Sequence, residues 1–166
     1  MKRITNPLSL MGAKFTNQSG TLPLEIYGQN LKSFHHKIII PSAQIKSGIL
    51  FAALNTIGET KVVEENTSRN HTEIMLKSFG ANISFNNNAS GSSISIVGKK
   101  ELISKNISIP SDLSSASFFI VAALINKNSK ITLKGININP TRDGILRALK
   151  LMGARIYIKN KRLVNE

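Results

Sequence analysis

Hydrophobic and polar positions follow the helical spacing of three to four residues in three similar stretches of the chain. These stretches are "NPLSLMGAKF", "TEIMLKSFGANISF" and "LRALKLMGARIYI". Each stretch reaches a glycine after its apolar residues, namely Gly12, Gly80 and Gly153. Because glycine readily adopts the left-handed conformation that closes many helices, we expect each helix to end there and a strand to follow.

A second pair of similar segments consists of "GILFAAL" (Gly48 to Leu54) and "FFIVAAL" (Phe118 to Leu124). Both are typical of a buried helix. The first helix opens on Ser42 and the second on Asp112 with Ser114, residue types that cap helix N-termini. An alternating strand is predicted after each helix, "ETKVVEE" in the first copy and "SKITLKGI" in the second. Corresponding positions lie about 70 residues apart, so the chain carries a repeated unit of helix, strand, helix and strand.

The remaining pattern indicates a hairpin and a boundary. "ANISFNNNASGSSISIVG" reads as two strands, with Asn86 to Asn88 and Gly91 expected in the turn between them. The repeat restarts at "SKNISIPSDLSS" (Ser104 to Ser115), which is the best boundary between two lobes. The last segment, "RIYIKNKRLVNE", reads as a strand without an evident partner. We therefore predict an α/β (α+β) chain cut from a larger repeated fold.

The composition narrows the class of protein. The 166 residues are 41% hydrophobic, which suits a packed core, and contain no cysteine, which fits a reducing compartment. No apolar run reaches the roughly 20 residues needed to span a bilayer, and no signal-peptide pattern is present. We expect a cytoplasmic protein that does not bind membranes.

The net charge of +13 favours anionic partners. The basic residues are scattered, however, and aromatic residues make up only 5% of the chain. A base-stacking surface for single-stranded nucleic acid needs more aromatic side chains than this. We therefore expect a small anionic ligand and no nucleic acid.

Polar residues gather where the apolar helix of "PSAQIKSGILFAAL" begins. A helix N-terminus exposes unpaired N–H groups and carries a partial positive charge, so it can bind an anion. Ser42 fits the N-cap, the small Ala43 permits close approach to the backbone, and the amide of Gln44 remains available to a ligand. The alternative is an ordinary capped helix with solvated side chains. Lys46 is expected to be solvated, or else to steer anions.

A second polar cluster is "SRNHTE", ahead of the helix that ends at Gly80. Asn70 or Ser68 can cap this helix, and Glu73 has the spacing of a capping box with Asn70. His71, at the start of the helix, is expected to pack or to form a hydrogen bond there.

Arg69 lies directly before the same helix, where its guanidinium could bind a phosphate through two hydrogen bonds. Alternatively, Arg69 is solvated or pairs with Glu64 or Glu65. Arg142 occupies the corresponding position in the second copy of the repeat.

The sequence "PSAQIKSGILFAALNTIGETKVVEENTSRNHTEIMLKSFGANI" resembles the EPSP synthase family of enolpyruvyl transferases. "SDLSSASFFIVAAL" and "GININPTRDGILRALKLMGA" continue the similarity in the same order, so that it covers nearly the whole chain. The joint occurrence of "SAQIKS" and "SRNHTE" makes it specific. The resemblance implies a two-lobed fold of repeated βαβαββ units. Residues 1–110 would form the latter part of the first lobe, and residues 111–166 the crossing and the start of the second.

The resemblance also implies an activity. The family transfers the enolpyruvyl group of phosphoenolpyruvate to shikimate 3-phosphate, giving 5-enolpyruvylshikimate 3-phosphate and phosphate, in the shikimate pathway of aromatic amino acid biosynthesis. It requires no metal or organic cofactor and is typically monomeric. Carried over position by position, Ser42, Ala43, Gln44 and Arg69 would bind shikimate 3-phosphate, and Gln44 would also contact phosphoenolpyruvate.

The chain departs from the family pattern in two residues and in extent. Asn70 stands where the family usually has Asp, and Ser111 where it often has Gly. The family's N-terminal lysine and arginine segment, its later Asp and Glu proton-transfer residues and its phosphoenolpyruvate-binding arginines have no counterpart here. We therefore assign no catalytic residue and expect a fragment that is inactive by itself.

Three alternatives remain open from the sequence. The first is the related transferase that acts on UDP-N-acetylglucosamine and shares the repeated fold. The second is a basic, non-catalytic module that binds nucleic acid. The third is a gene remnant without function.

Overall fold

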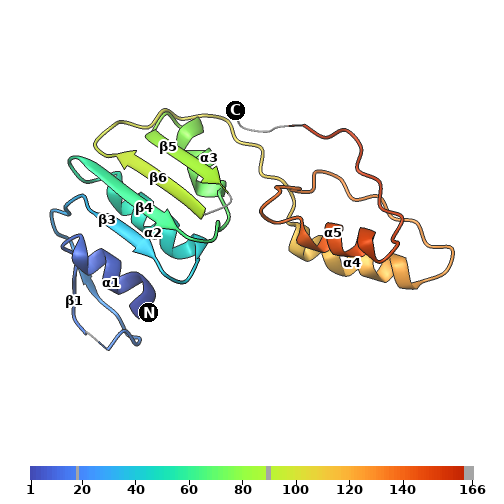
Figure 1. The fold of residues 1–166 in the computed structure, drawn as a ribbon, viewed down its shortest axis with the longest axis horizontal. Helices are drawn as coiled ribbons and strands as arrows, with labels where there is room; N and C mark the ends of the chain where they lie inside the picture. Colours follow the sequence, from blue (N-terminus) through green and yellow to red (C-terminus); the bar gives the residue numbers. More distant parts are fainter. Residues whose placement is uncertain (18, 89–90, 163–166) are drawn as a thin grey trace. The chain divides into compact units, whose positions relative to one another are not determined.

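The computed structural model describes residues 1–17, 19–88 and 91–162 of the chain. It divides into two compact units, Met1–Lys105 (unit 1) and Asn106–Glu166 (unit 2). Unit 1 contains, in chain order, α1 (Lys2–Leu10), β1 (Lys14–Phe15), β2 (Ile26–Tyr27), β3 (His35–Ile38), α2 (Ala43–Ala53), β4 (Glu59–Glu64), α3 (His71–Ser78), β5 (Asn82–Asn88) and β6 (Gly91–Val97) (Figure 1). Unit 2 contains α4 (Leu113–Ile125) and α5 (Gly144–Leu151).

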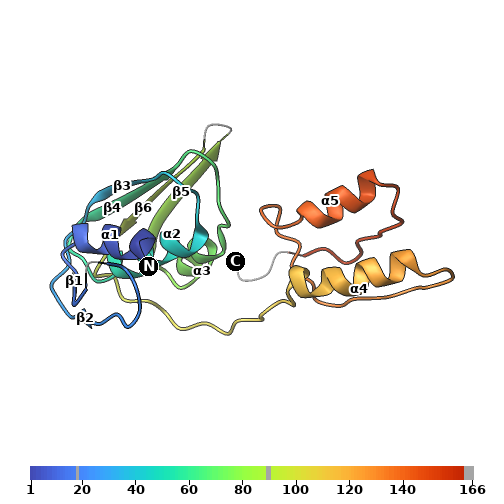
Figure 2. The same ribbon diagram turned by 90° about the horizontal axis from the view of Figure 1, so that it is seen from below.

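Unit 1 is built on a four-stranded sheet with the order β3-β4-β6-β5. Strand β3 pairs with β4 in parallel, whereas β6 pairs antiparallel with both β4 and β5. Helices α1, α2 and α3 lie on one face of this sheet (Figure 2). A separate pair, β1 and β2, is antiparallel.

The covered face of the sheet forms the core of unit 1. The alternation in β4 buries Thr60, Val62 and Glu64, and Val62 lies opposite Ile94 of β6 in the antiparallel register. Helix α2 contributes Ile49, which is fully buried, to the same cluster. The β4 pattern therefore carries one charged residue, Glu64, into the layer between sheet and helices.

The three predicted helix-ending glycines are confirmed. They have positive φ angles, +106° at Gly12, +82° at Gly80 and +89° at Gly153. At each one the N–H of the following alanine donates to the carbonyl of a leucine five residues earlier, in the pairs Ala13–Leu8, Ala81–Leu76 and Ala154–Leu149. This is the Schellman arrangement, and its recurrence shows that the sequence repeat is also a repeat of backbone geometry.

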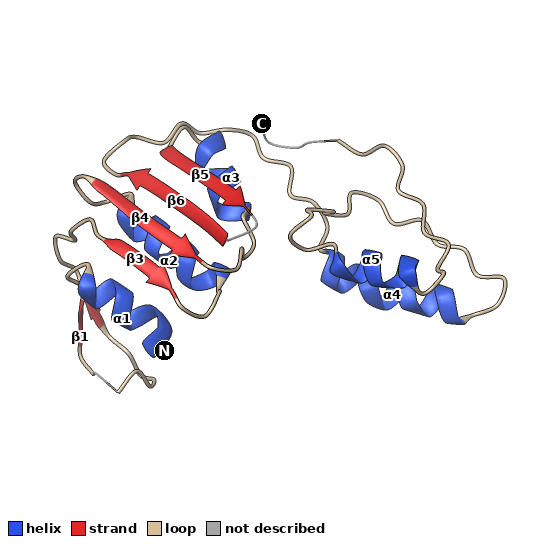
Figure 3. Cartoon of the chain, in the orientation of Figure 1, coloured by secondary structure: helices blue, strands red, loops and turns tan. Residues whose placement is uncertain are grey.

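The predicted strands of unit 2 are wrong for the residues that the structure describes. "SKITLKGI" (129–136) forms only an isolated parallel bridge between Ile136 and Ser111, and residues 155–162 contain no strand (Figure 3). The last four residues of the final predicted strand lie outside the described residues. The physical reason is the lack of a neighbour. Strand β4, the counterpart in unit 1, is paired on both sides, by β3 and by β6.

The hairpin of β5 and β6 is confirmed, but its predicted turn is wrong. Asn86, Asn87 and Asn88 continue β5 and pair with residues of β6, as far as Asn88 opposite Gly91. Residues 89 and 90, which separate the two strands in the sequence, lie outside the described residues. Gly91 begins β6 with φ +127°, and a Cβ there would lie 2.0 Å from the carbonyl oxygen of Glu64. This close approach is open only to glycine and brings β6 against the end of β4.

Candidate functional site

A hollow of about 440 Å³ lies where α2 and α3 begin. Three of the four sequence-predicted site residues, Ala43, Gln44 and Arg69, line it. The other lining residues come from the first turn of α3 and from the second and third turns of α2, and are Ser47, Gly48, Phe51, His71 and Thr72. Segments some 25 residues apart, such as Ser47 and Thr72, thus meet at one place, where their hydroxyl oxygens are 2.6 Å apart.

The fourth predicted residue, Ser42, caps α2 and is not among the residues that line the hollow. Its hydroxyl oxygen accepts a hydrogen bond from the backbone N–H of Ile45 at 3.5 Å, which confirms the predicted N-cap. The cap is uncharged, and the first turn of α2 contains no acidic residue. The partial positive charge of this helix start is therefore not neutralised by a carboxylate of its own first turn.

Arg69 is half-buried and lies in the loop between β4 and α3. Within the described part of the chain its guanidinium makes no ion pair, because the neighbouring glutamates have other partners. Glu65 pairs with Lys37 at 2.6 Å, and Glu64 pairs with Lys46 at 2.9 Å. The alternative of an Arg69–glutamate pair is therefore not formed among these residues.

Lys46 is the clearest correction to the sequence interpretation. Instead of being solvated it is 1% exposed, and its ammonium group lies 2.9 Å from Glu64 and 2.7 Å from Glu73, which are themselves 0% and 2% exposed. The spacing of Lys46, Leu50 and Ala53 places all three on the buried stripe of α2. That spacing was the signal in the sequence that would have indicated burial.

Glu64 is the centre of this cluster. Besides Lys46, it accepts hydrogen bonds from the hydroxyl of Ser68 at 2.7 Å, the backbone N–H of Ser68 at 3.2 Å and the hydroxyl of Ser92 at 3.1 Å. Desolvation alone would raise the pKa of Glu64, but the bonds from Ser68 and the bond and charge of Lys46 outweigh it and lower that pKa. Glu64 is therefore held ionised inside the core.

The predicted capping box at α3 is not formed. Asn70 occupies the N-cap position, but its side chain makes no capping hydrogen bond. Glu73, the expected reciprocal partner, turns inward to Lys46, and its second carboxylate oxygen is buried without a hydrogen-bond partner among the described residues. The charge of Lys46 outcompetes a backbone N–H for this carboxylate.

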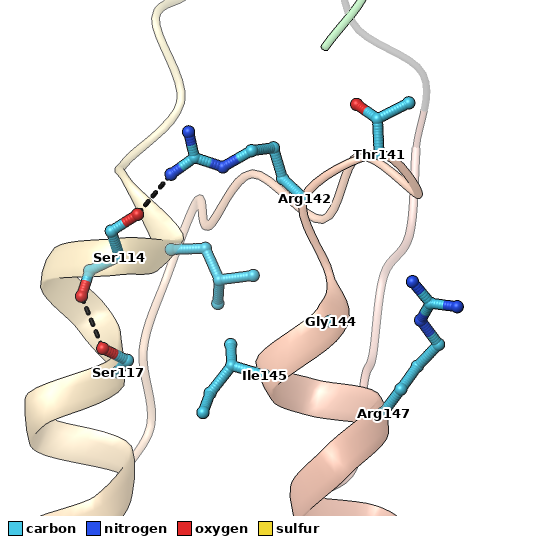
Figure 4. A pocket seen from close by; sticks show the side chains of 8 residues that line it. Ser114, Ser117, Thr141, Arg142, Gly144, Ile145 and Arg147 are labelled. Atoms are coloured by element: carbon cyan, nitrogen blue, oxygen red, sulfur yellow. Dashed lines mark hydrogen bonds between the residues drawn. The ribbon is translucent and has the colours of Figure 1, made fainter. Parts of the chain in front are cut away.

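Unit 2 contains a hollow of about 460 Å³ at the corresponding place, where α4 and α5 begin. Ser114, Ser117, Arg142 and Ile145 take the repeat positions of Gln44, Ser47, Arg69 and Thr72 in lining it (Figure 4). Here Arg142 donates to the hydroxyl of Ser114, and it lies 3.7 Å from Asp112. The arginine is thus engaged within its own unit.

Asp112 caps α4, as predicted from the sequence. One carboxylate oxygen accepts from the backbone N–H of Ser115 at 3.1 Å and from its hydroxyl at 3.2 Å. The backbone N–H groups of Ser114 and Ser115 lower the pKa of Asp112, so this cap carries a negative charge at neutral pH. The helix start of α4 therefore already holds an anion of the chain itself.

Other classes of site find no support among the described residues. No group of three or more His, Asp or Glu side chains there is arranged to hold a metal ion. Of the helices in this part of the chain, none combines the length and the apolar character needed to cross a bilayer.

Comparison with known proteins gives one consistent result. The sequence model of the family described as EPSP synthase (3-phosphoshikimate 1-carboxyvinyltransferase) matches residues 1–165. The 3-phosphoshikimate 1-carboxyvinyltransferases of Ruthia magnifica subsp. Calyptogena magnifica and Petrotoga mobilis are 47% and 48% identical to it, over 98% and 99% of the chain. The solved structure of EPSP synthase from Acinetobacter baumannii matches with a TM-score of 0.84 at 43% identity, over 99% of the chain.

The chain therefore belongs to the EPSP synthase family, and the predicted α/β fold of that family is confirmed. This membership decides against the related UDP-N-acetylglucosamine transferase. The chain spans 37% of the length of the Ruthia protein and 38% of the Petrotoga protein.

Proposed function

We propose that this chain supplies the part of an EPSP synthase that binds the phosphate of shikimate 3-phosphate. Family membership supports this substrate, and one observation carries the location. Arg69, free of ion pairs among the described residues, lines the same hollow as Ala43 and Gln44, the first two residues of α2. A cation and a helix N-terminus that face one space form a suitable seat for a phosphate dianion.

Each predicted residue has a distinct role in this proposal. Arg69 donates charge-assisted hydrogen bonds to the phosphate oxygens, and Ser42 and the backbone of Ala43 donate from the helix start. Gln44, whose side chain is exposed at the hollow, contacts both shikimate 3-phosphate and phosphoenolpyruvate. A side-chain amide suits this double role because it offers both donors and an acceptor.

The reaction of the whole enzyme is the transfer of the enolpyruvyl group from phosphoenolpyruvate to shikimate 3-phosphate, with release of phosphate. The described chain would contribute substrate binding, and we assign it no proton-transfer group. We further propose that residues 1–110 belong to the first lobe and residues 111–166 to the crossing and second lobe. We also propose that the protein is a monomer and that it works in the cytoplasm. The absence of cysteine fits the reducing conditions of that compartment.

The test is binding of shikimate 3-phosphate to the purified chain, measured by isothermal titration calorimetry, for wild type, Arg69→Ala and Arg142→Ala. A lost charge-assisted contact is worth about 1.5–3 kcal/mol, so Arg69→Ala should weaken binding roughly 10- to 100-fold. Its melting temperature should hardly change because the side chain is half-buried and unpaired. Arg142→Ala, the same change at the matching repeat position, should leave the affinity unaltered.

Equal losses in the two variants, or no binding by the wild type at millimolar ligand, would contradict the proposal. Release of phosphate from phosphoenolpyruvate and shikimate 3-phosphate by the chain alone would contradict its binding-only role.

A further inference from the structure

The guanidinium of Arg69 forms no ion pair or hydrogen bond among the described residues, yet Arg69 lines a defined hollow, so its position is fixed through its neighbours. The residue immediately before it, Ser68, is attached to Glu64 by its backbone N–H at 3.2 Å and by its hydroxyl at 2.7 and 3.0 Å. The backbone N–H bond and the hydroxyl bond, which is shared between both oxygens of the carboxylate, fix the backbone and the side chain of Ser68. The loop is therefore anchored one residue away from the proposed phosphate ligand.

Glu64, which anchors Ser68, is also connected to α2, the helix that forms the other side of the hollow. Glu64 is bound by Lys46 at 2.9 Å, and Lys46 lies in the first turn and a half of α2, two residues after Gln44. Lys46 also binds Glu73 of α3 at 2.7 Å. One buried ammonium group thus ties together β4, α2 and α3, the elements whose ends surround the hollow.

The cluster is electrostatically costly, which argues that it does more than fill the core. It buries two carboxylates with one ammonium group and leaves one oxygen of Glu73 without a hydrogen bond among the described residues. Apolar residues of similar volume are often at least as stabilising as a buried ion cluster. Unit 2 lacks the ammonium group, since buried Ala116 of α4 stands at the repeat position of Lys46.

We infer that Lys46, Glu64 and Ser68 are positioning residues that act through Arg69. They set the distance between the guanidinium and the start of α2, and so pre-organise the site for a phosphate dianion. This inference rests on the proposed function for its ligand. The anchoring of the loop is a separate statement, which can be tested without any ligand.

The first experiment is a double-mutant cycle with shikimate 3-phosphate as the probe, again by calorimetry. Ser68→Ala removes the hydroxyl bonds to Glu64 and should weaken binding about 3- to 10-fold, with only a small change in melting temperature. In an Arg69→Ala background the same change should have no further effect. Ser68→Thr retains the hydroxyl and should restore wild-type affinity.

The second experiment needs no ligand. Amide hydrogen exchange at residues 68 and 69, followed by NMR, should be several-fold faster in Ser68→Ala than in wild type and Ser68→Thr. The amide of Leu76 in α3 serves as the internal reference for global unfolding and should not change.

The outcomes separate the two proposals. If Arg69→Ala leaves the affinity unchanged, or the wild type does not bind, the proposed function is contradicted. The anchoring of the loop through Ser68 and Glu64 is then tested by the hydrogen-exchange data alone. If Arg69→Ala weakens binding but Ser68→Ala does not, the positioning role is overturned while the proposed function stands. Additive losses in the double variant would also overturn it, because Ser68 would then act independently of Arg69. Unchanged exchange at residues 68 and 69 overturns the anchor.

Discussion

The hollows of unit 1 and unit 2 are built from equivalent positions of one repeat but differ in charge. In unit 1 the helix start is capped by the neutral Ser42, and Arg69 has no ion pair among the described residues. In unit 2 the helix start is capped by the anionic Asp112, and Arg142 is bound within the unit. An anionic cap thus accompanies an arginine engaged within its own unit, whereas a neutral cap accompanies an arginine without an ion pair among the described residues.

A second difference lies beneath the hollows. In unit 1, buried Lys46 is paired with two buried glutamates. In unit 2, the buried residue at the position of this lysine is Ala116. The repeat thus preserves the backbone, as its three Schellman turns show, while the groups under and at the hollow have diverged.

The largest effect is expected from Lys46→Ala, which gives unit 1 the residue found in unit 2. Removal of the ammonium group leaves two buried carboxylates without their counter-charge, and breaking such a pair costs about 3–5 kcal/mol. The free energy of unfolding from urea titration, followed by NMR signals of β6, measures this. Lys37→Ala is the matched control, because the Lys37–Glu65 pair is exposed and should contribute less than about 1 kcal/mol. Similar losses in both variants would contradict the role of burial.

An intermediate effect is expected when the cap of unit 1 is made to resemble that of unit 2. Ser42→Asp retains a good N-cap but puts a carboxylate at the proposed phosphate seat, so it should weaken binding of shikimate 3-phosphate. Ser42→Asn removes the same hydroxyl and caps without charge. We expect the Ser42→Asp variant to bind shikimate 3-phosphate at least about 10-fold more weakly than the Ser42→Asn variant in calorimetry. This corresponds to a difference of roughly 1.4 kcal/mol in binding free energy. Equal affinities would show that the cap charge does not govern the site.

The smallest effect is a dependence of unit 1 stability on acid. Because the pKa of Glu64 is lowered from its ordinary 4.5, the unfolded chain takes up the proton first as the pH falls. The contribution of Glu64 is therefore complete above about pH 4.5 and is lost as the pH falls through its folded-state pKa. Urea midpoints between pH 7 and pH 3 should fall less steeply for Glu64→Gln than for wild type. Parallel curves would contradict this.

The sequence predicts the helix ends, the caps and the hairpin because these signals are local. The three glycine-ended helices and the caps Ser42 and Asp112, which are shared between the two units, and the hairpin strands of unit 1 each depend on residues within a few positions of one another. The grouping of Arg69 with Gln44 was expected only from the resemblance, and the role of both residues in binding stays a prediction.

Two errors show where local signals fail. Lys46 was expected in solvent because lysine is rarely buried, and its partners Glu64 and Glu73 lie 18 and 27 positions along the chain and meet it only in the folded unit. The segment 129–136 has a strand pattern, but a strand also needs a neighbour for its backbone hydrogen bonds, and the described residues of unit 2 provide a single bridge. Both outcomes depend on contacts distant in sequence.

The exposed apolar face of α4 affects how molecules of this protein attract or repel one another in solution. Phe119 is 61% exposed, whereas Ile49 at the matching position of α2 is fully buried, and Phe118 and Ile125 extend the apolar surface. Attraction between such surfaces acts at contact, while the +13 net charge repels neighbouring molecules over the Debye length. That length is about 30 Å at 0.01 M salt and about 8 Å at 0.15 M. Ionic strength thus sets whether the repulsion or the apolar face of α4 governs encounters between molecules.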